Sequence, residues 1–334
     1  MTTEMTTRER FQAVMNFQPF DRLPIVEWAP WWDKTVERWR SEGLPAELGW
    51  GDLYRHFGLD IYYQGGFGVR KEGCPSAPHH GAGILTDMDD YEKNIRPFLF
   101  PWPAVNEEVW IDWAEQQKRG EVALWFTLEG YFWFARGLLG IEPHMYAFYD
   151  HPELMHRINE DLTDWLVKII DKVLSICTPD FMTFAEDMSY NHGPMLSKTL
   201  FDEFMLPYYH KVIPRMKEAG VITIVDSDGD ITEPAAWFDA AGLDGILPLE
   251  RQAGVDVAKI REMHPKMRFI GCYDKMVMNK GEGAMRTEFE RLMPVAKQGG
   301  LIISCDHQTP PGVSLEDYYL YLKLFREYAE IAAQ

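Results

Sequence analysis

The sequence predicts an α/β fold: a single-domain (β/α)8 TIM barrel over residues 1–334, with an N-terminal helical extension and an insertion around residues 69–100. First, short apolar runs alternate with amphipathic helical segments about eight times. Second, polar clusters directly follow several of these runs, where a barrel has its active face. Third, no Gly/Ser linker or charge block divides the 334 residues. A doubly wound open sheet is the alternative.

The N-terminal half begins with a helix capped by Thr6 or Thr7 that must end before Pro19, because proline disfavours helical geometry in the residue before it. Residues 69–100 match no regular pattern, although 83–87 could form a hairpin strand. Strands are expected at 23–28, 59–63 and 122–128, and helices at 33–42, 48–57, 106–119 and 131–139.

The C-terminal half has a more regular pattern. A long helix at 152–177 precedes a strand at 181–185, and the helix at 197–219 should bend or break at Pro207 or Pro214. Near-continuously apolar strands such as those that follow are typical of parallel sheets buried on both faces. Strands are expected at 221–225, 243–247, 268–271 and 301–304, and helices at 233–241, 255–264, 284–298 and 315–332.

The composition excludes some function classes. Lys and Arg total 33 against 52 Asp and Glu, and the net charge of −19 repels nucleic acid and anionic membranes. The N-terminus lacks the apolar core of a signal peptide, and no apolar run approaches the ~18 residues of a membrane helix. The four cysteines contain no CxxC pair. We therefore expect a cytoplasmic protein, a monomer or homodimer, that acts on a small molecule.

Polar residues follow three of the expected strands, at 181–185, 221–225 and 301–304. Carboxylate, imidazole and thiol groups gathered there could hold zinc or another divalent ion. The expected metal ligands are Asp226, Asp228, Cys305 and His307, and the expected catalytic residues are Glu186, Asp228 and His307. Alternatively, the aspartates cap the next helix and the other groups form hydrogen bonds within the loops.

Aromatic residues gather near the ends of the first three expected strands. They could form a hydrophobic cap, or a pocket for a flat or methylated ligand; in an acidic protein an aromatic box suits a cation. His192 could act as a general base or be an ordinary loop histidine. The candidate substrate-binding residues are Trp28, Trp31, Trp125, Tyr131 and His192.

Five stretches together resemble the uroporphyrinogen decarboxylase superfamily, and they extend over nearly the whole chain. They are Arg8–Phe11 with Asp21–Pro24, His151–Met155, Gly193–Ser197, Phe204–Tyr208 and His307–Pro311. The resemblance implies a (β/α)8 barrel with its site at the carboxyl ends of the strands.

The chain departs from both branches of that superfamily. Decarboxylases carry an arginine-rich motif that grips substrate carboxylates, where this chain has Glu27 followed by Trp28, Ala29, Pro30, Trp31 and Trp32. Cobalamin-dependent methyltransferases bind zinc through His-x-Cys and a later Cys. Here the first motif reads Asp226-Ser227-Asp228, and His307 lies where the last Cys would be. The similarity is closer to the methyltransferase-like branch, and either an oxygen-rich metal site or no metal would fit these residues.

The resemblance implies an enzyme that moves a methyl group between a small methylated compound and a corrinoid, such as methylcobalamin, either free or on a separate corrinoid protein. One alternative is a metal-free decarboxylase or lyase of a non-porphyrin substrate. Another is a non-catalytic protein that binds a tetrapyrrole or corrinoid. In each case, the missing arginines argue against decarboxylation of uroporphyrinogen.

Overall fold

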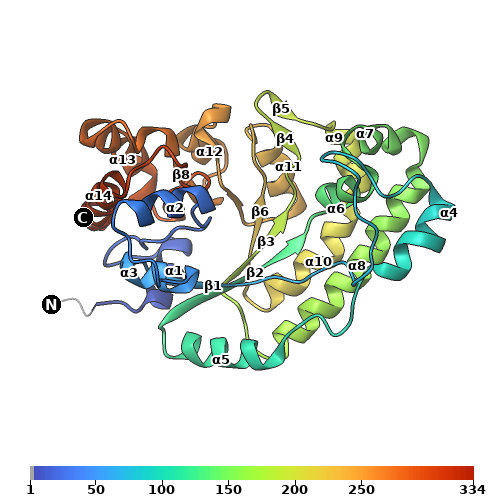
Figure 1. Cartoon of the computed structure of the whole chain (residues 1–334), viewed down its shortest axis with the longest axis horizontal. Coiled ribbons are helices and arrows are strands. Elements are labelled where there is room, and N and C mark those ends of the chain that lie inside the picture. The colour runs from blue at the N-terminus through green and yellow to red at the C-terminus, as the bar shows by residue number, and fades with distance from the viewer. Residues whose placement is uncertain (1–3) are drawn as a thin grey trace.

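A computed structural model describes residues 4–334 and contains a curled sheet of seven parallel strands (Figure 1). Every neighbouring pair is parallel, as the alternating sequence pattern predicts. In spatial order the strands are β1 (Ile61–Gly65), β2 (Val122–Glu129), β3 (Phe181–Ala185), β6 (Ile222–Asp226), β7 (Gly245–Leu247), β8 (Arg268–Tyr273) and β9 (Leu301–Cys305).

The predicted strand at 23–28 does not form among the described residues, although the segment is extended and buried. Side chains take the backbone groups that a ladder would use: the Ile25 N–H donates to an Asp60 carboxylate at 2.8 Å, and the Trp28 N–H donates to Ser304 Oγ at 3.2 Å. Pro24 has no N–H to donate. The eight-stranded prediction is therefore corrected to seven strands and one extended segment.

Helices surround the sheet, and the chain ends near α14 (Figure 1). Thr6 caps the first helix with a capping box to Glu9, which confirms the expected start. The helices are α1 (Thr7–Met15), α2 (Asp33–Ser41), α3 (Trp50–His56), α5 (Glu107–Lys118), α6 (Tyr131–Leu139), α7 (Ile141–Asp150), α8 (Pro152–Leu174), α9 (Lys198–Phe204), α10 (Leu206–Glu218), α11 (Pro234–Ala241), α12 (Val257–Met263), α13 (Glu282–Ala296) and α14 (Leu315–Ile331).

The predicted break in the helix at 197–219 occurs next to Pro207: α9 ends before Met205 and α10 begins at Leu206, while Pro214 lies inside α10. Other local predictions need correction. Residues 83–87 form no strand; the 69–100 region contains only the short helical pieces α4 (Met88–Asp90), a π-helix at Tyr91–Ile95 and a 3-10 turn at Arg96–Phe98. A small hairpin, β4 (Ser189–Tyr190) and β5 (Gly193–Pro194), follows β3.

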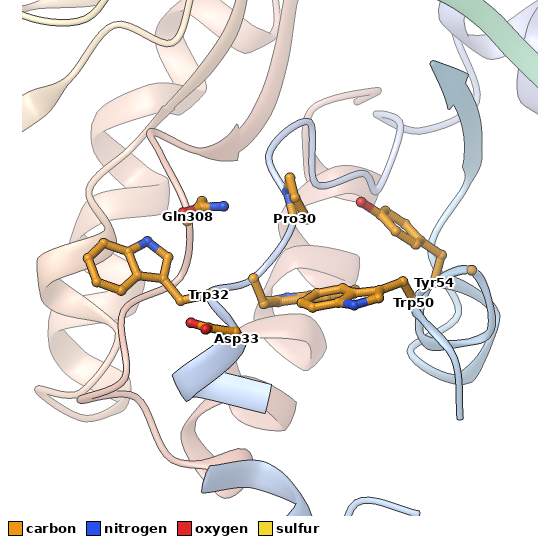
Figure 2. A pocket seen from close by; sticks show the side chains of 8 residues that line it. Pro30, Trp32, Asp33, Trp50, Tyr54 and Gln308 are labelled. Atoms are coloured by element: carbon orange, nitrogen blue, oxygen red, sulfur yellow. The ribbon is translucent and has the colours of Figure 1, made fainter. Parts of the chain in front are cut away.

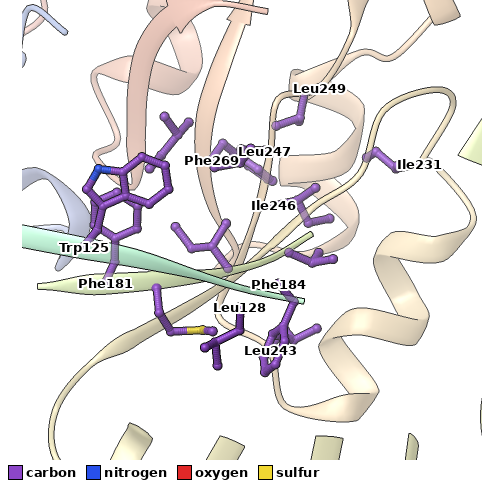
Figure 3. Packing of buried hydrophobic residues seen from close by; sticks show 14 of the residues in the cluster. Trp125, Leu128, Phe181, Phe184, Ile231, Leu243, Ile246, Leu247, Leu249 and Phe269 are labelled. Atoms are coloured by element: carbon purple, nitrogen blue, oxygen red, sulfur yellow. The ribbon is translucent and has the colours of Figure 1, made fainter. Parts of the chain in front are cut away.

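Apolar side chains fill the space between the strands and the helices (Figure 3). Trp125 from β2 stacks on Phe181 from β3 with ring centroids 4.8 Å apart. Burying one large apolar side chain contributes about 1.5–3 kcal/mol, so this packing fixes the strands against one another. The register pairs Ala185 with Asp226 and Asp226 with Leu247, which brings the carboxyl ends of β3, β6 and β7 level. Among residues 4–334, no helix is both long and apolar enough to cross a membrane.

Candidate active site

Three carboxylates meet beyond the carboxyl ends of β3 and β6. One oxygen from each of Asp187, Asp226 and Asp228 lies within 4.8 Å of the other two. Asp187 has a left-handed backbone with φ 41°, and its Oδ1 accepts a hydrogen bond from the Asp228 N–H at 3.2 Å. The unusual backbone at Asp187 turns the chain directly after β3 and is typical of functional turns.

Burial and mutual repulsion favour the protonated forms of these acids. Burial raises the pKa of Asp228 to about 7, helped by the charges of Asp187 and Glu250. The pKa of Asp226 is raised well above its usual value, first by burial and then by Asp187 and Asp228. Burial also raises the pKa of Asp187. The cluster therefore needs shared protons or a bound cation at neutral pH.

His307 and Lys275 border the acidic cluster. His307 Nε2 lies 3.7 Å from Asp228 Oδ2, and burial, followed by the charge of Lys275, lowers the pKa of this histidine. Lys275 Nζ lies 3.4 Å from Glu250 and 3.3 Å from Asp306. Burial opposes the charge of Lys275, but the two carboxylates outweigh it and raise its pKa. His307 is thus neutral near pH 7, while Lys275 is charged.

Glu186 is not among the clustered carboxylates. It is fully buried, and it accepts hydrogen bonds at 2.8 Å from the N–H groups of Tyr131 and Phe132 and one from the Tyr209 hydroxyl. These bonds satisfy free donors at the start of α6, where a carboxylate is also favoured by the helix dipole. The structure thus places Glu186 at the start of α6, and the next residue, Asp187, in the cluster.

Cys305 also lies apart from the acidic cluster. Its thiol is 1% exposed and contacts Met278 Sδ at 3.6 Å, and burial raises its pKa well above the usual thiol value. A buried protonated thiol of this kind is a poor metal ligand. The expected ligand set is therefore changed: Asp226 and Asp228 remain near His307, Asp187 joins them, and Cys305 is left out.

Gln308, the residue that follows His307 in the chain, lines an aromatic cleft of about 700 Å³ (Figure 2). Trp31 is buried in its wall and Trp32 is 43% exposed. Trp50 stacks over Trp31 with ring centroids 6.5 Å apart, and Tyr54 closes one end. The cleft offers broad apolar faces at the mouth of the sheet.

A second, smaller cavity of about 100 Å³ lies inside the curled sheet, and we call it the inner cavity. Trp28 and Trp125 line it, together with Glu27. Trp28 is fixed by a 2.8 Å hydrogen bond from its Nε1 to the Cys305 carbonyl, and its ring meets the His307 ring edge-on with centroids 6.2 Å apart. Trp28 thereby connects this cavity to the acidic cluster.

Two of the expected substrate-binding residues lie elsewhere. Tyr131 is fully buried in the core, where it packs on Tyr209, and it lines neither of these aromatic cavities. His192 is exposed at the tip of the β4–β5 hairpin, beside Tyr190. The other three, Trp28, Trp31 and Trp125, each line one of the two cavities.

Two charged groups of the site, Asp187 and Lys275, are not among the residues predicted from the sequence. Asp187 follows Glu186 directly, and strand alternation alone cannot tell which of the two faces the site once the backbone turns to positive φ. Lys275 lies two residues after the end of β8 at Tyr273. The signal for both was present, since each lies just past the carboxyl end of a parallel strand.

These residues fit a divalent metal ion of oxygen-preferring type. Three carboxylates within 4.8 Å repel one another unless a cation lies between them, and His307 adds a neutral imidazole nearby. A thiolate-rich zinc site does not fit, because Cys305 is buried against Met278. Lys275 pairs with Glu250 and Asp306, and its single positive charge does not compensate the three aspartates as well.

Comparison with known proteins identifies the family. The structure resembles a methyltransferase from Methanosarcina mazei with a TM-score of 0.67 and 15% identity, covering 97% of this chain and 99% of the other. A structure described as a vitamin-B12-independent methionine synthase from Listeria monocytogenes matches with a TM-score of 0.49 and 13% identity, covering 93% and 97%. Among curated protein sequences, none matches this chain significantly. The family model for uroporphyrinogen decarboxylase (URO-D) matches residues 110–328, more than half of the chain, and the protein therefore belongs to the URO-D family.

Proposed function

We propose that the protein is a metal-dependent methyltransferase that moves a methyl group between a small methylated compound and a corrinoid. The observation that supports it most is the group of Asp187, Asp226 and Asp228 beside His307 at the carboxyl ends of the strands. This is the position at which the methyltransferase branch of the superfamily is expected to hold a metal. In this proposal the extended segment 23–28 completes the barrel around the site.

The chain's own groups have separate tasks. The three aspartates would hold the ion, which would act as a Lewis acid toward a bound oxygen, nitrogen or sulfur atom. His307, neutral near pH 7 because burial lowers its pKa, accepts or returns the proton of that atom. Lys275 holds Glu250 and Asp306 in place and partly offsets their charges.

The aromatic cleft is the proposed site for the corrinoid. Its tryptophan faces suit a broad flat ring, and Gln308 places it next to His307. In the transfer, the methyl carbon leaves the donor atom, which keeps the bonding electron pair. The corrinoid supplies the electron pair of the new bond.

A metal-free decarboxylase or lyase is the second candidate, and one observation favours it. Without a cation, Asp228 with its pKa raised to about 7 would carry a proton near neutral pH beside His307. A protonated acid paired with a neutral imidazole suits proton transfer to a carbanion after loss of carbon dioxide. The same residues would then act as acid and base, with no metal.

Corrinoid spectroscopy distinguishes the candidates. The purified protein is mixed with reduced corrinoid and, separately, with methylcobalamin, and a panel of small methylated compounds is added. Conversion of the corrinoid spectrum in step with methyl turnover supports the proposal, and Asp228→Asn should abolish it while the exposed-surface control Glu37→Gln retains it. A corrinoid spectral shift without turnover indicates a binding protein. No spectral response in the metal-loaded protein contradicts the proposal and favours the lyase.

A further inference from the structure

Glu27 is a buried acidic group without a cationic partner among the described residues. Its side chain is 3% exposed and lines the inner cavity. Its carboxyl group accepts hydrogen bonds from Ser304 Oγ at 2.8 Å, from the Cys305 N–H at 3.1 Å and from the Tyr318 hydroxyl at 3.4 Å, and all three donors are neutral. Among the described residues, no Lys, Arg or His forms an ion pair with it. An isolated buried carboxylate is costly, and a cation from outside would remove that cost.

Tyr62, which also lines the cavity, carries a polar atom without a partner among the described residues. The Tyr62 hydroxyl is buried and forms no hydrogen bond with the described residues. Buried hydroxyl groups in native proteins are usually paired, so an unpaired one at a cavity wall points to a ligand or a water molecule. Tyr62 keeps its proton, because burial raises its pKa well above the usual value.

Aromatic rings form most of the remaining wall. Trp28, Tyr54, Tyr62 and Trp125 all line the inner cavity, and Trp125 is held in place by its stack on Phe181. Ring faces attract cations, and the attraction is stronger where water is excluded. A cavity of about 100 Å³ has room for roughly three or four non-hydrogen atoms, given about 30 Å³ for each water-sized group.

We propose that the inner cavity binds a small methylated ammonium ion, such as trimethylammonium, with the Glu27 carboxylate as its counter-ion and the Tyr62 hydroxyl as a hydrogen-bond partner. The methyl groups face the aromatic rings, and the positive charge offsets the buried carboxylate. A neutral molecule of the same size would leave the ionised form of Glu27 without a counter-ion.

The position of Tyr54 suggests that the bound ion could be the methyl donor. Tyr54 lines both the inner cavity and the aromatic cleft, so a ligand in one lies next to a ring in the other. That the ion is the methyl donor rests on the function proposed above, whereas its binding does not. In such a transfer the C–N bond breaks with its electrons left on nitrogen. Trimethylammonium departs as neutral dimethylamine, and the corrinoid's electron pair bonds the methyl carbon.

Calorimetric titration with trimethylammonium chloride at constant ionic strength tests the binding. Wild-type protein should bind the ion, and Glu27→Gln should weaken binding at least about tenfold, because it removes the counter-ion and keeps the shape. Glu37→Gln, an exposed glutamate on α2, is the matched control and should bind as wild type does. Isopropanol, a neutral molecule with four non-hydrogen atoms, should bind far more weakly than the ion.

Tyr62→Phe keeps the proposal testable if Glu27→Gln fails to fold. It removes only the unpaired hydroxyl, so the fold should survive, and trimethylammonium binding should weaken about fivefold. Absence of binding to folded wild type, equal binding of the ion to Glu27→Gln, or equal binding of isopropanol would overturn the site. Methyl transfer from a different donor without ammonium binding would overturn the site and leave the methyltransferase function intact. Binding without transfer supports the site and removes the ion as methyl donor.

Discussion

Burial of single carboxyl groups sets the pH response of this protein at the residue scale. The pKa of Glu27 is raised from its ordinary value to about 7, chiefly by burial, in spite of the hydrogen bonds from Ser304 and Cys305. The folded state therefore binds an extra proton between pH about 4.5 and 7. The stability that comes from the raised pKa is fully present below pH about 4.5 and is lost as pH rises through 7.

Glu27→Gln should remove this pH dependence. The variant keeps the neutral form of the side chain at every pH, so its free energy of unfolding relative to wild type should improve from pH 5 to pH 8, by up to about 3 kcal/mol. Urea denaturation of both proteins at several pH values, in the absence of amines, measures the difference. A constant difference across that range would show that Glu27 is ionised in the folded protein throughout.

Some residues of the candidate site could be predicted from the sequence, and others could not. Asp226, Asp228 and His307 were predicted to meet because each follows a parallel strand, and the structure brings them together. Glu186 was chosen over Asp187, yet Glu186 bonds the start of α6 while Asp187 joins the cluster. The choice depends on one left-handed residue and on a helix elsewhere in the sequence, and neither can be seen in local sequence patterns.

At the scale of elements, Gly130 joins β2 to α6 at a point where no side chain fits. A Cβ atom there would lie 2.2 Å from the Ala185 carbonyl oxygen and 2.4 Å from the Glu186 Cδ. Gly130→Ala should therefore push Glu186 off the start of α6 and lower the free energy of unfolding by about 2 kcal/mol or more. Thermal and urea denaturation measure the loss.

Gly283→Ala is the matched control for that substitution. Gly283 lies in the first turn of α13, and an added Cβ would meet nothing within 4 Å. Alanine is the better helix former, so stability should stay the same or rise by up to about 1 kcal/mol. Equal effects of the two substitutions would show that the close approach at Gly130 does not affect the free energy of unfolding.

Most elements followed from periodicity, and the exceptions have physical causes. The C-terminal strands and helices formed close to the expected positions, because continuous apolar runs bounded by glycine and polar residues leave few alternatives. Residues 23–28 read as a strand but form no ladder, since Asp60 and Ser304 side chains take their N–H groups. Contacts from residues so distant in sequence cannot be inferred from the segment itself.

At the scale of the whole molecule, the placement of the arginines disfavours a substrate with many carboxylates. Five arginines near the expected decarboxylase motif are each engaged elsewhere or exposed: Arg22 bonds Asp60, Arg38 bonds Glu42, Arg40 bonds the Leu48 carbonyl, Arg55 reaches Tyr63 and Arg70 bonds the Gly137 carbonyl. None lines the aromatic cleft or the inner cavity. A substrate with many carboxylates would therefore meet an acidic site without compensating cations.

The protein should not convert uroporphyrinogen I or III to coproporphyrinogen. Each of the eight substrate carboxylates brought near the three aspartates without a cation costs on the order of a kcal/mol or more even at high effective dielectric. Anaerobic incubation followed by porphyrin analysis measures the conversion, with an authentic decarboxylase as the positive control. Turnover at a comparable rate would mean that substrate carboxylates bind in another part of the molecule.

The metal content of catalytically active protein tests the central claim most directly. Elemental analysis of purified wild type that transfers methyl groups should find close to one divalent ion per chain, held by Asp187, Asp226 and Asp228. Asp226→Asn and Asp228→Asn should lose the ion and the activity together, while Cys305→Ser should retain the ion, because its thiol lies against Met278. Active wild type without a divalent ion would contradict the account.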